Sequence, residues 1–199
     1  MIVQGVSIGE MMNQSKLVLT KPSVATFEQF EKHGGQREAL TYVGVAAAIS
    51  AIIGLVLGLA VTAIVGGSFL GAVISAIINF IQVMVAFFVS AWLIYTVGRS
   101  QGGTGTQEEV FYTFSLFVAP ILAISSALAI IPCLGALAAL ALLIYQIYLG
   151  YLAVRSSMNL DQNKAIITMV VVFVVQLLIA GVFSGIALAL GAGAAAVGA

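Results

Sequence analysis

Five long apolar runs constrain this chain more than any other feature of its sequence. They cover residues 40–65, 70–97, 110–131, 134–153 and 166–190, and none of them contains Asp, Glu, Lys, Arg or His. About 20 apolar residues are enough for a helix to cross the hydrocarbon core of a bilayer. Only 7% of all residues are charged, against about 25% in a typical soluble domain. The sequence therefore predicts an all-α fold: a polytopic membrane bundle of five transmembrane helices, preceded by a short amphipathic helix.

The polar composition argues against several classes of function. Seven basic and seven acidic residues cancel, so nothing indicates a nucleic-acid partner. The single Cys133 cannot form an intramolecular disulfide, and the lone His33 cannot make a metal site alone. We predict no catalytic, cofactor-binding or metal site, and we expect no enzyme. The lipid bilayer is the first predicted partner.

The basic residues predict the orientation of the chain. With five spans, all of them fall on one side of the membrane, and the other exposed segments contain none. They are Lys16, Lys21, Lys32, Arg37, Arg99, Arg155 and Lys164. Basic loops stay on the cytoplasmic side, so a multi-pass protein of the cell membrane is expected, with its N-terminus inside and its C-terminus outside. This divides the chain into a cytoplasmic segment 1–38, a membrane domain 39–190 and a flexible tail 191–199.

The N-terminal segment is predicted to contain one short helix. Thr26 and Gln29 have the spacing of a capping box, and Phe27 and Phe30 lie one turn apart. Two interpretations of the helix at 26–33 remain open. It lies on the bilayer surface as an interfacial helix, or it leads into the first span and packs on the bundle.

Small residues recur every four positions on several spans. Such stripes let neighbouring helix backbones approach closely, and in lipid this packing drives association. They consist of Ser50, Gly54, Gly58 and Thr62 in the first span, Gly67, Gly71, Ser75 and Asn79 at the second, and Gly181, Gly185 and Ala189 in the fifth. The stripes predict close packing within the bundle, and self-association of the chain is a further option.

A few polar or helix-breaking residues lie inside the spans: Asn79, Gln82, Pro120, Gln146 and Gln176. An amide that faces lipid is costly, so Asn79 and Gln82 are expected to face the bundle, as glue between helices or as part of a transport site. Pro120 removes a backbone donor, so a kink or a re-entrant break is expected there.

The loop between the second and third spans is the candidate interaction surface. Its residues are Gly102, Gly103, Gly105, Thr106, Glu108 and Glu109. The glycines allow a tight turn below the membrane, and Thr106 with Glu109 forms a capping box for the third span. Glu108 is then left to face solvent or a protein partner.

Motifs in this loop and elsewhere resemble those of a known family. They are Pro22 with Thr26-Phe27, the run 102–106 with Pro120, the run 131–135 and the run 160–165. In this order, over about residues 20–190, they resemble the Yip family of five-span Ypt/Rab-interacting membrane proteins. The eukaryotic Asp-Leu-Tyr-Gly-Pro motif is replaced by residues 38–42, which favours a prokaryotic branch. The resemblance implies a cytoplasmic N-terminus and a role in membrane organisation or trafficking through protein partners.

Two functions compete at this point. The first is a membrane scaffold or interaction protein that contacts other membrane or cytoplasmic proteins, motivated by the small-residue stripes. The second is a channel or transporter for a small neutral solute or ion, motivated by the intramembrane amides and the break expected at Pro120. The absence of ionisable residues from the spans argues against ion-coupled transport.

Overall fold

The computed structural model describes residues 5–131 and 134–197, and within these residues it has seven helices. They are α1 (Ile8–Thr20), α2 (Val24–Phe30), α3 (Gln36–Val65), α4 (Phe69–Ser100), α5 (Gln107–Leu128), α6 (Leu134–Met158) and α7 (Gln162–Val197). The helices α3 to α7 are long and apolar enough to cross a membrane. The predicted all-α fold with five membrane-spanning helices is confirmed.

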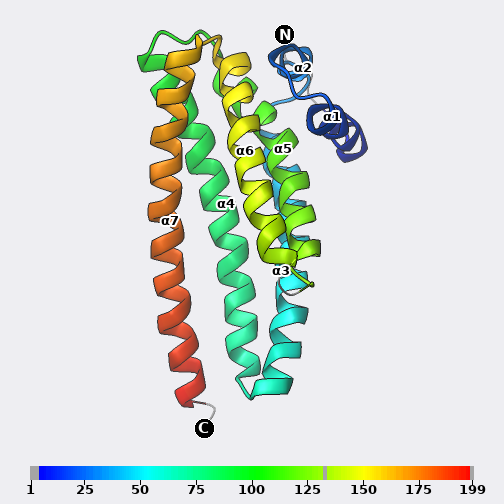
Figure 1. Ribbon diagram of the computed structural model, residues 1–199, viewed down its shortest axis with the longest axis vertical. Coiled ribbons are helices and arrows are strands. Elements are labelled where there is room, and N and C mark those ends of the chain that lie inside the picture. Colours follow the sequence, from blue (N-terminus) through cyan, green and yellow to red (C-terminus); the bar gives the residue numbers. More distant parts are fainter. Residues whose placement is uncertain (1–4, 132–133, 198–199) are drawn as a thin grey trace.

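The spanning helices run lengthwise beside one another, and α1 and α2 lie against one end of this bundle (Figure 1). α4 packs between α3 and α7, while α5 packs on both α3 and α6. The spans differ in length: α5 and α6 have 22 and 25 residues, whereas α3, α4 and α7 have 30, 32 and 36. The end of α5 and the start of α6 consequently stop short of the level that α3, α4 and α7 reach (Figure 1).

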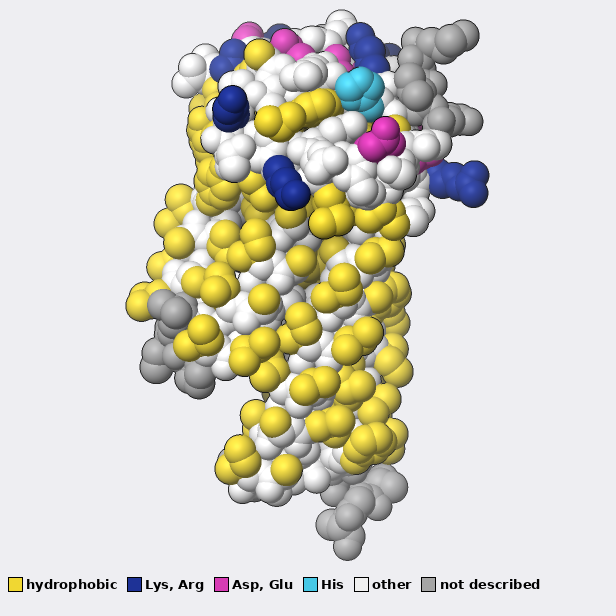
Figure 2. All heavy atoms as spheres, turned by 90° about the vertical axis from the view of Figure 1, so that its right-hand side faces the viewer, with side chains coloured by type: hydrophobic (Ala, Val, Ile, Leu, Met, Phe, Trp, Pro, Cys, Tyr) yellow, Lys and Arg dark blue, Asp and Glu magenta, His cyan; other side chains and the backbone are white. Residues whose placement is uncertain are grey.

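The two ends of the bundle differ in polarity. Figure 2 shows Lys, Arg, Asp and Glu side chains gathered at the end that carries α1 and α2, above a surface dominated by hydrophobic side chains. We call this the charged end; it also holds the α4–α5 and α6–α7 loops. The α3–α4 turn and the end of α7 lie at the opposite, far end (Figure 1).

The core is centred on α5, whose residues 110–117 are all buried. Aromatic rings fill much of this region. The Phe114 ring lies 5.0 Å from that of Phe117 and 5.8 Å from that of Phe87, and Phe27 of α2 contacts Phe117 edge-on at 6.2 Å. The short helix α2 is therefore part of the same core as the spans.

The N-terminal segment differs from its prediction in two ways. The helix expected from Thr26 begins at Val24, because Ser23 is its N-cap and accepts a hydrogen bond from the Thr26 amide at 3.1 Å. The proposed Thr26–Gln29 capping box is therefore wrong. A second helix, α1, precedes it and was not predicted, although Ser7 and Glu10 form a complete capping box at its start.

The structure also decides between the two interpretations of the helix at 26–33. Phe27 and Phe30 have only 0% and 4% of their surface exposed, and both belong to the hydrophobic core. A helix on the bilayer surface would direct these rings into lipid. The helix α2 instead packs on the bundle.

The small-residue stripes make close contacts at some positions. The Ser50 hydroxyl of α3 accepts a hydrogen bond from Ser126 of α5 at 2.7 Å, and a Cβ added to Gly67 would lie 2.9 Å from Cγ2 of Thr62. A Cβ added to Gly58 would lie 3.5 Å from the Ala72 Cβ, so α3 and α4 are in close contact there. A Cβ added to Gly54, Gly181 or Gly185 would meet no described atom within 4 Å. At these three glycines the predicted packing within the chain is wrong, because they lie on open helix surface.

Two further expectations concern the far half of the molecule. The helix α5 continues through Pro120 to Leu128, so the re-entrant break considered there is wrong. The helix α7 continues to Val197, through most of the segment expected to be a frayed tail. Cys133, at the predicted end of the third span, lies outside the described residues.

Candidate functional site

Three tyrosine hydroxyls from three spanning helices fasten α1 to the bundle. Tyr42 of α3 bonds to the Ser15 hydroxyl at 3.1 Å, Tyr112 of α5 donates to Gln14 at 2.7 Å, and Tyr145 of α6 donates to the Leu19 carbonyl at 2.6 Å. Between these bonds, α1 buries Met11 and Val18, which are 1% and 0% exposed. These contacts hold α1 against the bundle along most of its length.

Several exposed side chains of α1 are apolar. Ile8, Met12 and Leu17 have 39%, 50% and 42% of their surface exposed, next to the exposed Lys16 and Lys21. Exposed apolar side chains beside lysines are typical of a helix that lies in the membrane interface. In α1, however, Leu17 lies on a different side of the helix from Ile8 and Met12. The side opposite Met11 and Val18 carries Gly9, Asn13 and Thr20, so α1 has no single apolar face for the bilayer.

The glycines of the candidate interaction loop allow close backbone contact with the last residues of α6, which lead into the α6–α7 loop. A Cβ on Gly105 would lie 1.6 Å from the Ser157 carbonyl oxygen, and one on Gly103 would lie 3.0 Å from the Met158 carbonyl oxygen. Gly102 has a φ of +91°, a backbone conformation that favours glycine. The loop therefore packs closely against Ser157 and Met158, in addition to forming the turn that the sequence predicts.

Hydrogen bonds reinforce this contact between the two loops. The Thr104 amide donates to the Met158 carbonyl at 3.1 Å, and the Asn159 side chain donates to the Thr104 hydroxyl at 3.1 Å. Gln101, at the end of α4, donates to the Thr168 hydroxyl of α7 at 2.8 Å. The charged ends of α4, α5, α6 and α7 are therefore joined by one set of contacts.

The capping box predicted at the start of the third span is confirmed. The Glu109 amide donates to the Thr106 hydroxyl at 3.3 Å, and the Thr106 amide donates to the Glu109 carboxylate at 2.9 Å. These bonds occupy Thr106 and Glu109. Glu108 is exposed, with its carboxyl carbon 3.6 Å from the position of a Cβ on Gly35.

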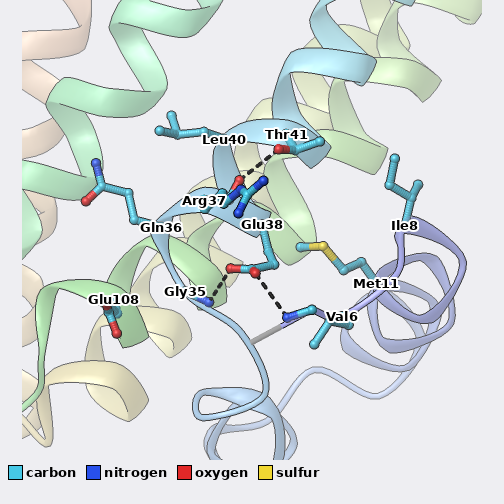
Figure 3. Close-up of a pocket in the computed structure, with 11 residues that line it drawn as sticks. Val6, Ile8, Met11, Gly35, Gln36, Arg37, Glu38, Leu40, Thr41 and Glu108 are labelled. Atoms are coloured by element: carbon cyan, nitrogen blue, oxygen red, sulfur yellow. Dashed lines mark hydrogen bonds between the residues drawn. The ribbon is translucent and has the colours of Figure 1, made fainter. Parts of the chain in front are cut away.

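Glu108 lines an open groove of about 940 Å³ between α1 and the start of α3 (Figure 3). Arg37 and Glu38 of α3 contribute charge to this groove, and Ile8 and Leu40 contribute apolar surface. The Glu38 carboxylate accepts hydrogen bonds from the Gly35 and Gly5 amides at 3.1 and 3.2 Å. Glu38 therefore holds the groove together, whereas Arg37 and Glu108 are exposed in it.

A second acidic residue, Glu31, is buried where α2 meets α6. It is 8% exposed and accepts a hydrogen bond from the Ser156 hydroxyl at 3.1 Å. Burial raises the pKa of the Glu31 carboxyl above its ordinary value of 4.5, with a further increase from Glu109 and Glu28. The Ser156 bond and Lys32, whose Nζ lies 3.7 Å from Glu31 Oε1, act in the opposite direction.

The stability of the docked α2 should therefore depend on pH. A carboxyl with a raised pKa in the folded state stabilises that state below the unfolded pKa, and this stability is lost as the pH rises through the folded pKa. Glu31 should therefore lower the thermal midpoint in detergent as the pH rises from about 4.5 to neutral, whereas Glu38, whose pKa is lowered, acts in the opposite direction. Glu31→Gln should remove the Glu31 contribution and be the more stable protein at neutral pH.

Glu28→Gln is the matched control, because Glu28 is an exposed carboxylate on the same helix. Glu28 is the smallest of the influences on the Glu31 pKa, so this variant should change the pH profile far less than Glu31→Gln does. Parallel profiles for the wild type and Glu31→Gln would show that Glu31 does not couple the docking of α2 to pH.

The intramembrane candidates do not form one polar path. Gln176 donates to the Ala86 carbonyl at 2.8 Å and to the Ser90 hydroxyl, so it joins α7 to α4. Gln146 and Gln176 line a common cavity, of which Asn79, Gln82 and Pro120 are not part. Asn79 is exposed, so the expectation that it faces the bundle is wrong, while Gln82 is half-buried.

No cluster of metal ligands forms in the described part of the chain, where no three His, Cys, Asp or Glu side chains come together in a suitable arrangement. The features that sequence reasoning missed are α1, its tyrosine contacts and the buried Glu31. Of these, only α1 has a local signal, namely the Ser7–Glu10 capping box.

The fold and the charged end define a five-span helical membrane protein. The family model of the Yip1 domain matches residues 16–184, from within α1 to late in α7. The chain therefore belongs to the Yip1 domain family, as the resemblance predicts. It matches no curated protein and no solved structure.

Proposed function

We propose that this protein is a membrane scaffold of the Yip type whose charged end faces the cytoplasm and binds partner proteins. The observation that carries the proposal is the open groove that Glu108 of the α5 start and Arg37 of α3 both line. Membership of the Yip1 domain family supports a role in membrane organisation or trafficking, and the groove is the surface that we assign to it.

The orientation rests on the basic side chains. Lys and Arg residues gather at the charged end (Figure 2), and basic segments next to membrane helices are retained in the cytoplasm. The N-terminus would accordingly be inside and the C-terminus outside. The groove would then be open to cytoplasmic proteins.

The frame of the groove suits recognition of a partner. Its α1 wall is held by the tyrosine contacts, and the start of α5 is held by the contact between Gly105 and Ser157. A surface that is already ordered loses less conformational entropy on binding. The exposed Arg37 and Glu108 offer opposite charges, so the expected partner segment also carries charges of both signs.

The proposal predicts a loss of partner contacts in Glu108→Gln. With a photoreactive benzoyl-phenylalanine in place of Gln36, which also lines the groove, irradiated native membranes should yield discrete protein adducts. A charge at the rim of an interface is worth up to about 1 kcal/mol, so Glu108→Gln should reduce the adducts by up to about fivefold. Adduct yields are compared on immunoblots at equal expression.

Asp161→Asn is the control, since Asp161 is an exposed acid at the same end but outside the groove. It should leave the adducts unchanged. Equal yields in the wild type and Glu108→Gln would remove the groove from the proposal. Rapid solute flux through liposomes containing the purified protein would instead favour the competing function, a channel or transporter.

A further inference from the structure

A second cavity lies within the spans, separate from the groove at the charged end. Its volume is about 410 Å³, and α4, α5, α6 and α7 all contribute to its walls. Most of the lining is aliphatic or aromatic; the polar lining groups are Ser90, Ser125, Gln146 and Gln176. A site of this kind suits a mainly apolar ligand that is oriented by a few hydrogen bonds.

The cavity is accessible from the bilayer. Leu143 and Ile147 of α6 and Phe173 and Leu177 of α7 line it, and they are 44%, 38%, 38% and 58% exposed. These residues belong both to the cavity and to the outer surface of two neighbouring helices. The cavity therefore opens between α6 and α7, where lipid surrounds the protein.

Gln146 lines the cavity next to the residue through which α6 contacts α1. It lies roughly 18 Å from the charged end of α6, at 1.5 Å per residue. The preceding residue, Tyr145, donates to the Leu19 carbonyl of α1, close to the exposed Lys21. A lysine and a tyrosine hydroxyl at this level are typical of the interface, where the ester groups of lipids also lie.

The cavity continues from this level towards the far end. Ala180 also lines it and lies roughly 27 Å along α7 from its start, at 1.5 Å per residue. Gln146 makes no hydrogen bond with the described residues, and Gln176 uses only its amide nitrogen, towards α4. Amide groups at this depth need a partner, because lipid chains offer none and unpaired polar groups are costly.

From this geometry we propose that the cavity binds one acyl chain of a bilayer lipid from the leaflet at the charged end. The chain lies along the apolar walls between α5 and α7, and the ester carbonyl oxygen accepts a hydrogen bond from the Gln146 amide. The bound chain fills the space that the shallow packing of α6 on α7 leaves open. This lipid is bound within the protein, in contrast to the bilayer lipids that only surround it.

The full-length protein can be tested in vesicles of phosphatidylcholine that contain a small fraction of phosphatidylcholine with a diazirine on one acyl chain. After irradiation, we expect adducts at Val118 and Leu122, half-buried lining residues of α5, alongside those at the outer surface. Ala180→Phe places a ring in the cavity and should abolish the adducts on α5. Ala189→Phe, on the exposed surface of the same helix, should leave them unchanged.

A second pair of variants tests the hydrogen bond without changing the volume of the cavity. Gln146→Met should weaken the α5 adducts about fivefold, the equivalent of one net hydrogen bond of about 1 kcal/mol. Asn79→Leu removes an exposed amide outside the cavity and should have no effect. Adducts confined to outward-facing residues in the wild type, or α5 adducts that persist in Ala180→Phe, would overturn the proposal.

Discussion

Replacing Gly105 by alanine is expected to cost about 3 kcal/mol of folding free energy, at the upper end of what overpacking usually costs. The new Cβ would lie 1.6 Å from the Ser157 carbonyl oxygen and 2.7 Å from its carbonyl carbon. Both are backbone atoms, so no rotation of a side chain relieves the clash. The two loops must separate, and the Thr104–Met158 hydrogen bond must break with them. The thermal midpoint in detergent should fall by several degrees.

Gly54→Ala provides the matched control for this substitution. Its Cβ would meet no described atom within 4 Å, and Gly54 lies inside α3. Alanine is favoured over glycine in a helix by about 0.5–1 kcal/mol, so this variant should be as stable as the wild type or slightly more stable. A Gly105→Ala protein with the thermal midpoint of the wild type would show that the loops are not in contact.

Gly34→Ala is expected to release α1 and α2 from the bundle, at a cost of about 2–3 kcal/mol. The new Cβ would lie 2.3 Å from the Cε2 atom of Tyr112. That ring is 0% exposed, and its hydroxyl holds Gln14 at 2.7 Å, so the ring cannot turn away without losing α1. Limited trypsin digestion should show the release as faster cleavage after Lys16, since proteolysis follows the population of the open form.

Two further variants test whether the loss of stability comes from the clash with Tyr112 or from alanine itself. Gly9→Ala is the control on α1, because its Cβ would approach nothing closer than the Ser7 hydroxyl at 3.9 Å. Tyr112→Leu removes the clashing ring atoms, so the double variant with Gly34→Ala should lose less stability than the sum of the single losses. Additive losses would mean that Gly34 and Tyr112 act independently.

The sequence predicts the five spans and the start of α5 because these signals are local. A membrane-length apolar run can be recognised without knowing what it packs against. Thr106 and Glu109 form reciprocal hydrogen bonds within one helical turn. The choice of Ser23 over Thr26 as the N-cap of α2 was beyond such reasoning. Both residues carry a hydroxyl, and the side chain of Thr26 instead donates to the Lys21 carbonyl.

The contacts that build the candidate site are long-range, and the sequence offers no local signal for them. The helix α1 has 13 residues of mixed polarity, without the long apolar run that marks a span. Gly105 was read as a turn residue, whereas it fits against Ser157, which lies a whole hairpin of helices away in the chain. Nothing local in the sequence marks Glu31 as buried, because its partner Ser156 lies on α6.

The short α5–α6 hairpin has a consequence for the membrane around the protein. At the far end only α3, α4 and α7 remain, whereas the charged end also holds α5, α6 and the two N-terminal helices (Figure 1). The molecule therefore tapers from its charged end to its far end, and wherever this taper falls within the bilayer it displaces more lipid from one leaflet than from the other. Several copies inserted with the same orientation would give the two leaflets unequal areas, which a flat bilayer can accommodate only by bending.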